Sequence, residues 1–96
     1  MFDFATFIFT AASLLSRARS AARGRDGDAV REAVFALRDA SDKAHATRMV
    51  ALCDAMYRAL PPFLTDDVQD EIEALIAAIA DELDQVTGEL QVSHIA

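Results

Sequence analysis

The C-terminal third of the chain carries its clearest periodicity. Residues 65–92 read TDDVQDEIEALIAAIADELDQVTGELQV. Their apolar residues recur at three- and four-residue steps, so on a helix of 3.6 residues per turn they fall within an arc of about 100°. This pattern predicts one long amphipathic helix whose apolar stripe the other segments must cover. The stripe consists of Val68, Ile72, Leu75, Ile76, Ile79, Leu83, Val86 and Leu90.

Local residues indicate where this helix begins and ends. Pro61-Pro62 ends the segment before it, because proline lacks a backbone donor and restricts the residue that precedes it. Thr65 is a natural N-cap, and the two aspartates that follow it lie where the helix dipole favours negative charge. Gly88 leaves the C-terminal end open, either near Thr87 or near Val92.

Residues 2–22 favour another helix. Phe2 and Phe9 then point away from its apolar face, and this aromatic pair needs cover from another element or another chain. A strand over residues 2–10 is the alternative, because that run is rich in aromatic and β-branched residues. Such a strand would need a partner strand, most simply across a dimer. The apolar face of the helix holds Phe4, Phe7, Ala11, Leu14, Ala18 and Ala22, with Ile8 and Leu15 beside it.

The same N-terminal run does not read as a membrane or export segment. Its apolar part, Phe2 to Leu15, is shorter than the ~20 residues that span a bilayer. A secretory signal carries positive charges before the apolar part, whereas here the arginines follow it. The run superficially resembles a mitochondrial presequence in its Arg and Ser content and near lack of acids. We expect it to be part of the fold.

Residues 28–60 contain no Gly and no Pro, but their apolar phase changes once. The stripe of the second half is turned by about 100° from that of the first, far beyond the drift of about 20° per heptad. The change falls at Ser41-Asp42-Lys43, where Ser41 or Asp42 could cap a new helix. We therefore favour two helices, 28–40 and 43–60, over one bent helix. Two aromatic residues lie off both stripes, Phe35 and Tyr57.

A turn at Gly24-Arg25-Asp26-Gly27 separates the first two helices. Asp26 or Asp28 can cap the helix that follows. The arginines around this turn suit the negative end of a helix dipole and could pair with the acidic C-terminal helix, while a phosphate or RNA patch is the alternative. They are Arg17, Arg19, Arg23 and Arg25.

These segments predict an all-α chain with a single domain over residues 1–96. The expected architecture is a small antiparallel bundle of three to four helices, about 3–22, 28–40, 43–60 and 65–92. A chain of 96 residues buries only a modest core. Because the stripes hold many alanines, a homodimer would bury more, and we expect one.

Charge is divided unevenly along the chain. Residues 1–60 hold all nine Lys/Arg and seven acids, a net charge of +2, whereas residues 61–96 hold nine acids and no Lys or Arg, a net charge of −9. An acidic chain is repelled by the phosphate backbone, so we expect no nucleic acid as a direct partner. A basic surface on another protein suits it better.

The sequence offers few groups for catalysis. The one cysteine, Cys53, allows no internal disulfide, fits a reducing compartment and reads as a small core residue. His45 and His94 have no ligand spacing around them, so we expect no metal and no cofactor. Phosphate-binding loops and nucleophile motifs are absent from the sequence, and no small-molecule substrate is expected.

His45 carries the alternative function. The run Ala44–Met49 resembles phosphotransfer domains, which place a histidine on a bundle helix with a lysine three residues later; here Arg48 takes that place, and Met49 stands where those domains have glycine. Arg38 and His45 also resemble the Arg and His pair of helical RNase toxins of the HEPN class. That resemblance implies His45 as a base toward a 2′-hydroxyl and Arg38 as the phosphate contact.

The leading expectation is a non-enzymatic interaction module, a regulator, inhibitor or adaptor of the cytoplasm. It would bind a basic partner surface through the acidic side of its last helix, and it could compete with nucleic acid for that surface. Phe2 or Phe9 would supply apolar anchoring. The expected acidic contacts are Asp66, Asp67, Asp70, Glu73, Asp81 and Asp84.

Overall fold

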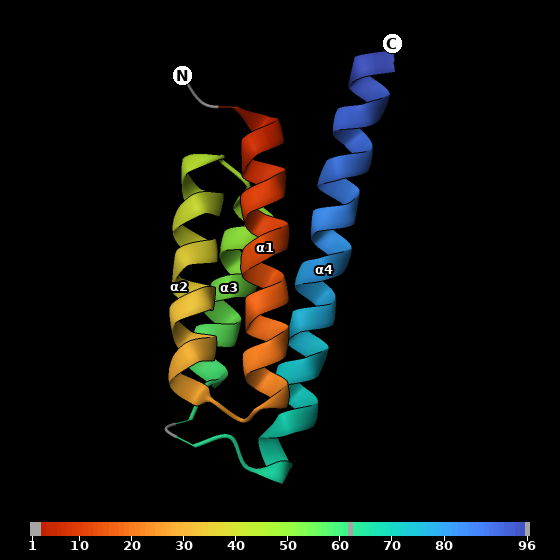
Figure 1. Cartoon of the computed structure of the whole chain (residues 1–96). Helices are drawn as coiled ribbons and strands as arrows, with labels where there is room; N and C mark the ends of the chain where they lie inside the picture. The colour runs from red at the N-terminus through yellow and green to blue at the C-terminus, as the bar shows by residue number, and fades with distance from the viewer. Residues whose placement is uncertain (1–2, 62, 96) are drawn as a thin grey trace.

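The computed structural model describes residues 3–61 and 63–95, with side chains up to residue 88. Over these residues the chain forms four helices and no strand. Consecutive helices run in opposite directions, as Figure 1 shows, so the start of the first helix and the end of the last lie at the same end of the bundle. The helices are α1 (Phe4–Arg23), α2 (Gly27–Lys43), α3 (Thr47–Ala59) and α4 (Asp66–Ile95). The expected all-α antiparallel bundle is confirmed.

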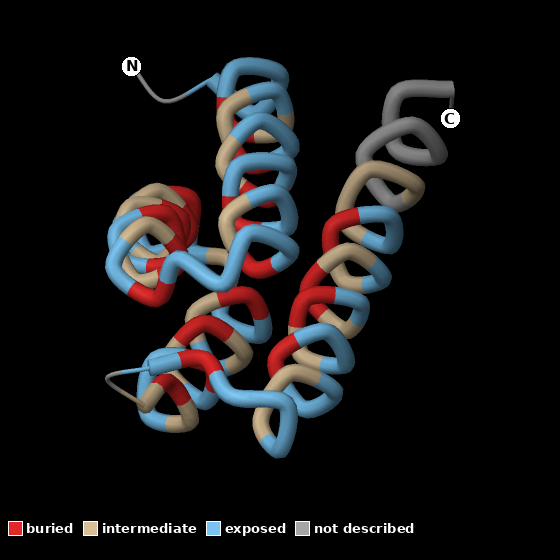
Figure 2. Tube along the Cα trace, turned by 60° about the horizontal axis from the view of Figure 1, so that its bottom comes forward, coloured by how far each residue is buried: buried red, intermediate tan, exposed pale blue. Residues whose placement is uncertain are grey.

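The helices pack in chain order around one core. α1 packs against α2, α2 against α3, α3 against α4, and α4 closes the ring against α1. Buried positions face the middle of the bundle on every helix, and α4 is buried along one side only (Figure 2). The largest fully buried side chains are Leu37, Met49, Met56, Ile72, Ile79, Val30 and Val34.

The start of the chain is helical from Phe4 onward, so the alternative of a strand over residues 2–10 is wrong. Asp3 caps α1: its carboxylate accepts from the amide of Ala5 at 3.0 Å and from the hydroxyl of Thr6 at 2.9 Å. These hydrogen bonds lower the pKa of Asp3, the bond from Thr6 most of all. A good N-cap therefore outweighs the β-propensity of the aromatic run.

The break between α2 and α3 is confirmed, but its predicted position is wrong. α2 continues to Lys43, and the connection is Ala44–Ala46. Ser41 does not cap a new helix: it is fully buried inside α2, and its hydroxyl donates to the Leu37 carbonyl at 2.7 Å. Ala46 occupies the N-cap of α3 and makes no side-chain hydrogen bond there. The change of phase marked the break, whereas the apparent capping residues did not.

α4 continues to Ile95, past both of the C-terminal ends that the sequence left open, near Thr87 and near Val92. Its start agrees with the prediction, since the carbonyl of Thr65 accepts from the amides of Val68 and Gln69. Gln69 also ties α4 to α1: its Nε2 donates to the carbonyl of Ala22, at the C-terminal end of α1, at 3.0 Å. The predicted cap of α2 is Asp26, which accepts from the amide of Ala29 at 3.1 Å.

Candidate interaction surface

The six acids expected to contact a partner are all exposed on α4. We call this set the acidic face: Asp66, Asp67, Asp70, Glu73, Asp81 and Asp84. The apolar residues between them turn toward the core, where Ile72, Ile76, Ile79 and Leu83 are buried. The helical period that builds the core therefore also sets the carboxylates toward solvent.

Four members of the acidic face have no partner in the described part of the chain. Among the residues that the structure describes, no ion pair or hydrogen bond engages the carboxylates of Asp67, Asp70, Asp81 and Asp84. Asp66 pairs with Arg25, and Glu73 accepts a weak bond from Gln69 at 3.4 Å. Like charges left together on one helix create a negative potential that a cationic surface would neutralise.

The arginines near the end of α1 moderate that potential at one end of α4. Besides the pair of Arg25 with Asp66, a small groove of about 240 Å³ between α1 and α4 brings Arg19 and Arg23 beside Glu73. The expectation that the arginines could pair with the acidic helix is thus met at Asp66. Asp81 and Asp84, two to three turns further along α4, lie beyond this groove, and no ion pair engages them among the described residues.

Phe2 and Phe9 are the aromatic residues that we expected to anchor a partner. Phe9 is 78% exposed on the outer side of α1. Phe2 lies outside the described residues. Phe4, which we expected on the buried face, is 46% exposed, because the first turn of α1 extends past the core residues.

His45 lies in the turn between α2 and α3 and not on a helix. Its φ is 57°, a left-handed conformation that residues other than glycine rarely adopt, and its side chain is exposed. Arg38 does not complete a site with it in this structure: its Nε donates to Asp54 of α3. The hydrogen bond and the charge of Asp54 raise the pKa of Arg38 above its ordinary value. The guanidinium of Arg38 is therefore engaged by α3, and no hydrogen bond joins it to His45 among the described residues.

Cys53 is fully buried in α3. Burial raises the pKa of its thiol to about 12, with a further contribution from the charge of Asp54. A thiol that stays protonated and inaccessible is a poor nucleophile. Within the described part of the chain, no three His, Cys, Asp or Glu residues gather as a metal site, and no helix is long and apolar enough to cross a bilayer.

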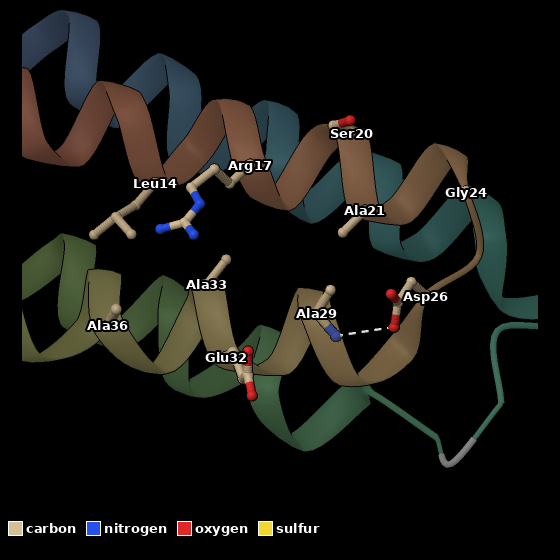
Figure 3. A pocket seen from close by; sticks show the side chains of 10 residues that line it. All are labelled: Leu14, Arg17, Ser20, Ala21, Gly24, Asp26, Ala29, Glu32, Ala33 and Ala36. Atoms are coloured by element: carbon tan, nitrogen blue, oxygen red, sulfur yellow. Dashed lines mark hydrogen bonds between the residues drawn. The ribbon is translucent and has the colours of Figure 1, made fainter.

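A groove of about 540 Å³ lies between α1 and α2. Figure 3 shows Arg17 reaching from α1 over the groove, with the small side chain of Ala21 on the same helix and those of Ala29 and Ala33 opposite on α2. Asp26 is at one end, where it is engaged as the cap of α2. The groove holds one cation and no paired nucleophile and base, so it offers no catalytic arrangement.

A second surface feature involves residues that the sequence pattern placed off the apolar stripes. Phe35 of α2 is 62% exposed and Tyr57 of α3 is 43% exposed, and together they line a hollow of about 470 Å³. The sequence indicated that both rings would be exposed, because neither residue falls on the apolar stripe of its helix. Only the packing of α2 against α3 brings the two rings to one place.

A comparison with protein-family models, with curated proteins and with solved structures finds no match for this chain. Inferences about function therefore depend on the residues and their arrangement.

Proposed function

We propose that this chain is a non-enzymatic protein-interaction module that binds a basic surface of another protein through the acidic face of α4. The observation that carries the proposal is a set of exposed carboxylates that no described residue pairs with, those of Asp67, Asp70, Asp81 and Asp84. A cationic partner would supply the ion pairs that the chain itself lacks. Such a contact favours fast association and selects against acidic partners.

The same charge suits a regulator or inhibitor that occupies a nucleic-acid-binding surface. A row of carboxylates along a helix presents repeated negative charge, which is also what a phosphate backbone presents. Phe9 on the adjacent helix α1 would add an apolar contact at the edge. The single buried thiol suits a reducing compartment, and we place the activity in the cytoplasm.

The test compares two double variants that remove the same amount of charge. Asp81→Asn/Asp84→Asn removes two acids of the acidic face, whereas Asp39→Asn/Asp42→Asn removes two exposed acids of α2. Partners captured from a lysate of the native host by the wild-type chain are identified, and the affinity of each variant for the purified partner is measured. We expect the α4 variant to bind about tenfold more weakly, and the α2 variant to bind like the wild type.

Salt provides the second measurement. Raising the salt concentration from about 50 mM to about 500 mM shortens the Debye length several-fold, so binding through exposed charges should weaken strongly. Equal losses in the two double variants, or binding that salt leaves unchanged, would contradict the proposal. A function centred on His45 is tested by incubating the wild-type chain and His45→Ala with RNA, and separately with a phosphorylated receiver domain. An RNase or phosphotransfer activity that the wild type shows and His45→Ala lacks would contradict the present proposal.

A further inference from the structure

The side of the bundle formed by α2 and α3 presents an exposed aromatic hollow. We call it the aromatic patch: Phe35 and Tyr57, with Asp28, Arg31 and Glu32 around the same hollow of about 470 Å³. The four patch residues on α2 follow one another at steps of three and four, so they form one outward stripe beside the ring of Tyr57. They are Asp28, Arg31, Glu32 and Phe35. Exposed aromatic rings surrounded by charged groups are typical of protein interfaces.

The charged edge of the aromatic patch is partly fixed in place. The guanidinium of Arg31 donates to Asp28 at 3.2 Å and to the carbonyl of Pro61 at 3.2 Å. Glu32, the next residue, is exposed and has no ion pair or hydrogen bond among the described residues. The patch therefore presents a positioned cation and an unpaired carboxylate side by side, next to the two rings.

We propose that the aromatic patch is the interface of a homodimer, in which Phe35 of each copy enters the hollow beside Tyr57 of the other and Glu32 faces the partner's Arg31. A two-fold axis brings the same surface of both copies together, so the surface must complement itself. The patch meets this condition because it carries both signs of charge. The acidic face of α4 does not, since two copies of it would repel each other.

The size of this side of the bundle fits a modest dimer. α2 has 17 residues and α3 has 13, so the side is about 25 Å long and, at two helix diameters, about 20 Å wide. These dimensions give a projected area of about 500 Å², less than the about 800 Å² that each partner of a standard interface buries, so we expect a small and weak interface. The total accessible surface of one chain is 6143 Å².

The dimer would leave the acidic faces free. α2 packs against α1 and α3 but not against α4, and Figure 1 shows α2 and α4 at opposite sides of the bundle. An interface around Phe35 would therefore keep both copies of α4 exposed. The inference does not depend on the proposed function, because it concerns a different surface and a different partner.

The test is the oligomeric state of two matched pairs of variants. Phe35→Ala and Phe9→Ala each remove one exposed helical phenylalanine, but only the first lies in the aromatic patch. Glu32→Arg and Asp81→Arg each reverse one exposed, unpaired acid, and again only the first lies in the patch. Sedimentation equilibrium over about 1–200 μM gives the mass and the dissociation constant, and circular dichroism checks that each variant remains folded.

We expect the wild-type chain to reach twice its mass of 10.4 kDa within this range. Phe35→Ala should raise the dimer dissociation constant about 30-fold or more, as expected for an aromatic hot spot, and Glu32→Arg should also weaken the dimer. Phe9→Ala and Asp81→Arg should leave it unchanged. A wild-type chain that stays monomeric throughout, or a dimer that survives Phe35→Ala or is dissociated equally by Phe9→Ala, would overturn the inference.

Discussion

Two residues at helix ends hold a backbone conformation that their side chains disfavour. Arg25 and His45 have φ of 56° and 57°, each directly after the C-cap of a helix. At the second of these turns, the amide of Ala46 donates to the backbone carbonyl of Ser41 at 2.9 Å, and the amide of His45 donates to the backbone carbonyl of Asp42 at 3.0 Å. This is the Schellman pattern, in which glycine is the usual residue at the left-handed position. At the first turn, Gly24 stands one residue too early to serve, with φ of −81°.

His45→Gly should therefore stabilise the fold. Glycine removes the left-handed penalty of the histidine, and we expect the free energy of unfolding to rise by about 1 kcal/mol. Urea unfolding followed by circular dichroism measures the change as a shift of the midpoint at constant slope. Ala44→Gly is the control: Ala44 has φ of −84° and is buried, so glycine there should destabilise. A destabilising His45→Gly would show that the imidazole contributes to the fold.

Cys53 should make stability fall in alkaline solution. Burial raises the pKa of its thiol to about 12 from an ordinary value of 9.0, so the folded chain keeps a proton that the unfolded chain releases. The contribution to stability is complete below about pH 9 and is lost as the pH rises toward 12. Unfolding free energies measured across this window should fall less steeply for Cys53→Ala than for the wild type. Equal slopes would contradict the assignment.

At the scale of elements, α4 shows how much a single period predicts. Its core side and its acidic face both follow from the 3.6-residue repeat, and both are confirmed up to residue 88. Its C-terminal end was predicted less well: Gly88 left two ends open, near Thr87 and near Val92, and α4 passes both. A glycine whose neighbours favour helix weakens the helix but does not end it, and α4 continues through Gly88 to Ile95.

Gly88→Ala should stabilise the last turns of α4. Apart from the backbone of its own helix, a Cβ at this position would meet no described atom within 4 Å, so the methyl group fits without strain. Alanine loses less backbone entropy than glycine when it becomes helical. We expect the free energy that stabilises the last turns of α4 to increase by about 0.5–1 kcal/mol. Amide hydrogen exchange in residues 84–92 should slow in the variant. Unchanged exchange would mean that these turns open regardless of residue 88.

The connection between α2 and α3 shows the opposite case. Ser41 has the residue type of a cap, but its position on α2 turns it into the core, where its hydroxyl bonds to the preceding turn. Serine serves either purpose, and which one it serves depends on what packs beside it. The sequence could therefore predict that a break exists, but not which residues form it.

At the scale of the whole molecule, the connectivity is simple. Three of the four packed helix pairs join neighbours in the chain, and only α1 with α4 joins its ends. Chains dominated by such local contacts fold quickly, because little loop entropy is lost before contacts form. We expect the main refolding phase to finish within about 10 ms in stopped-flow measurements. A main phase lasting seconds would indicate an additional slow step, such as association, which would then depend on concentration.

The helical class, the favoured division into four helical segments and the separation of a basic first part from an acidic last part could all be predicted from the residues. These properties depend on residue types and on their period within one segment. The packing of the helices was needed to show that Asp66 pairs with Arg25, that no described residue pairs with Asp81 or Asp84, and that Phe35 and Tyr57 share one hollow. Such pairings join residues distant in the chain, and no local period specifies which side of one helix will face another.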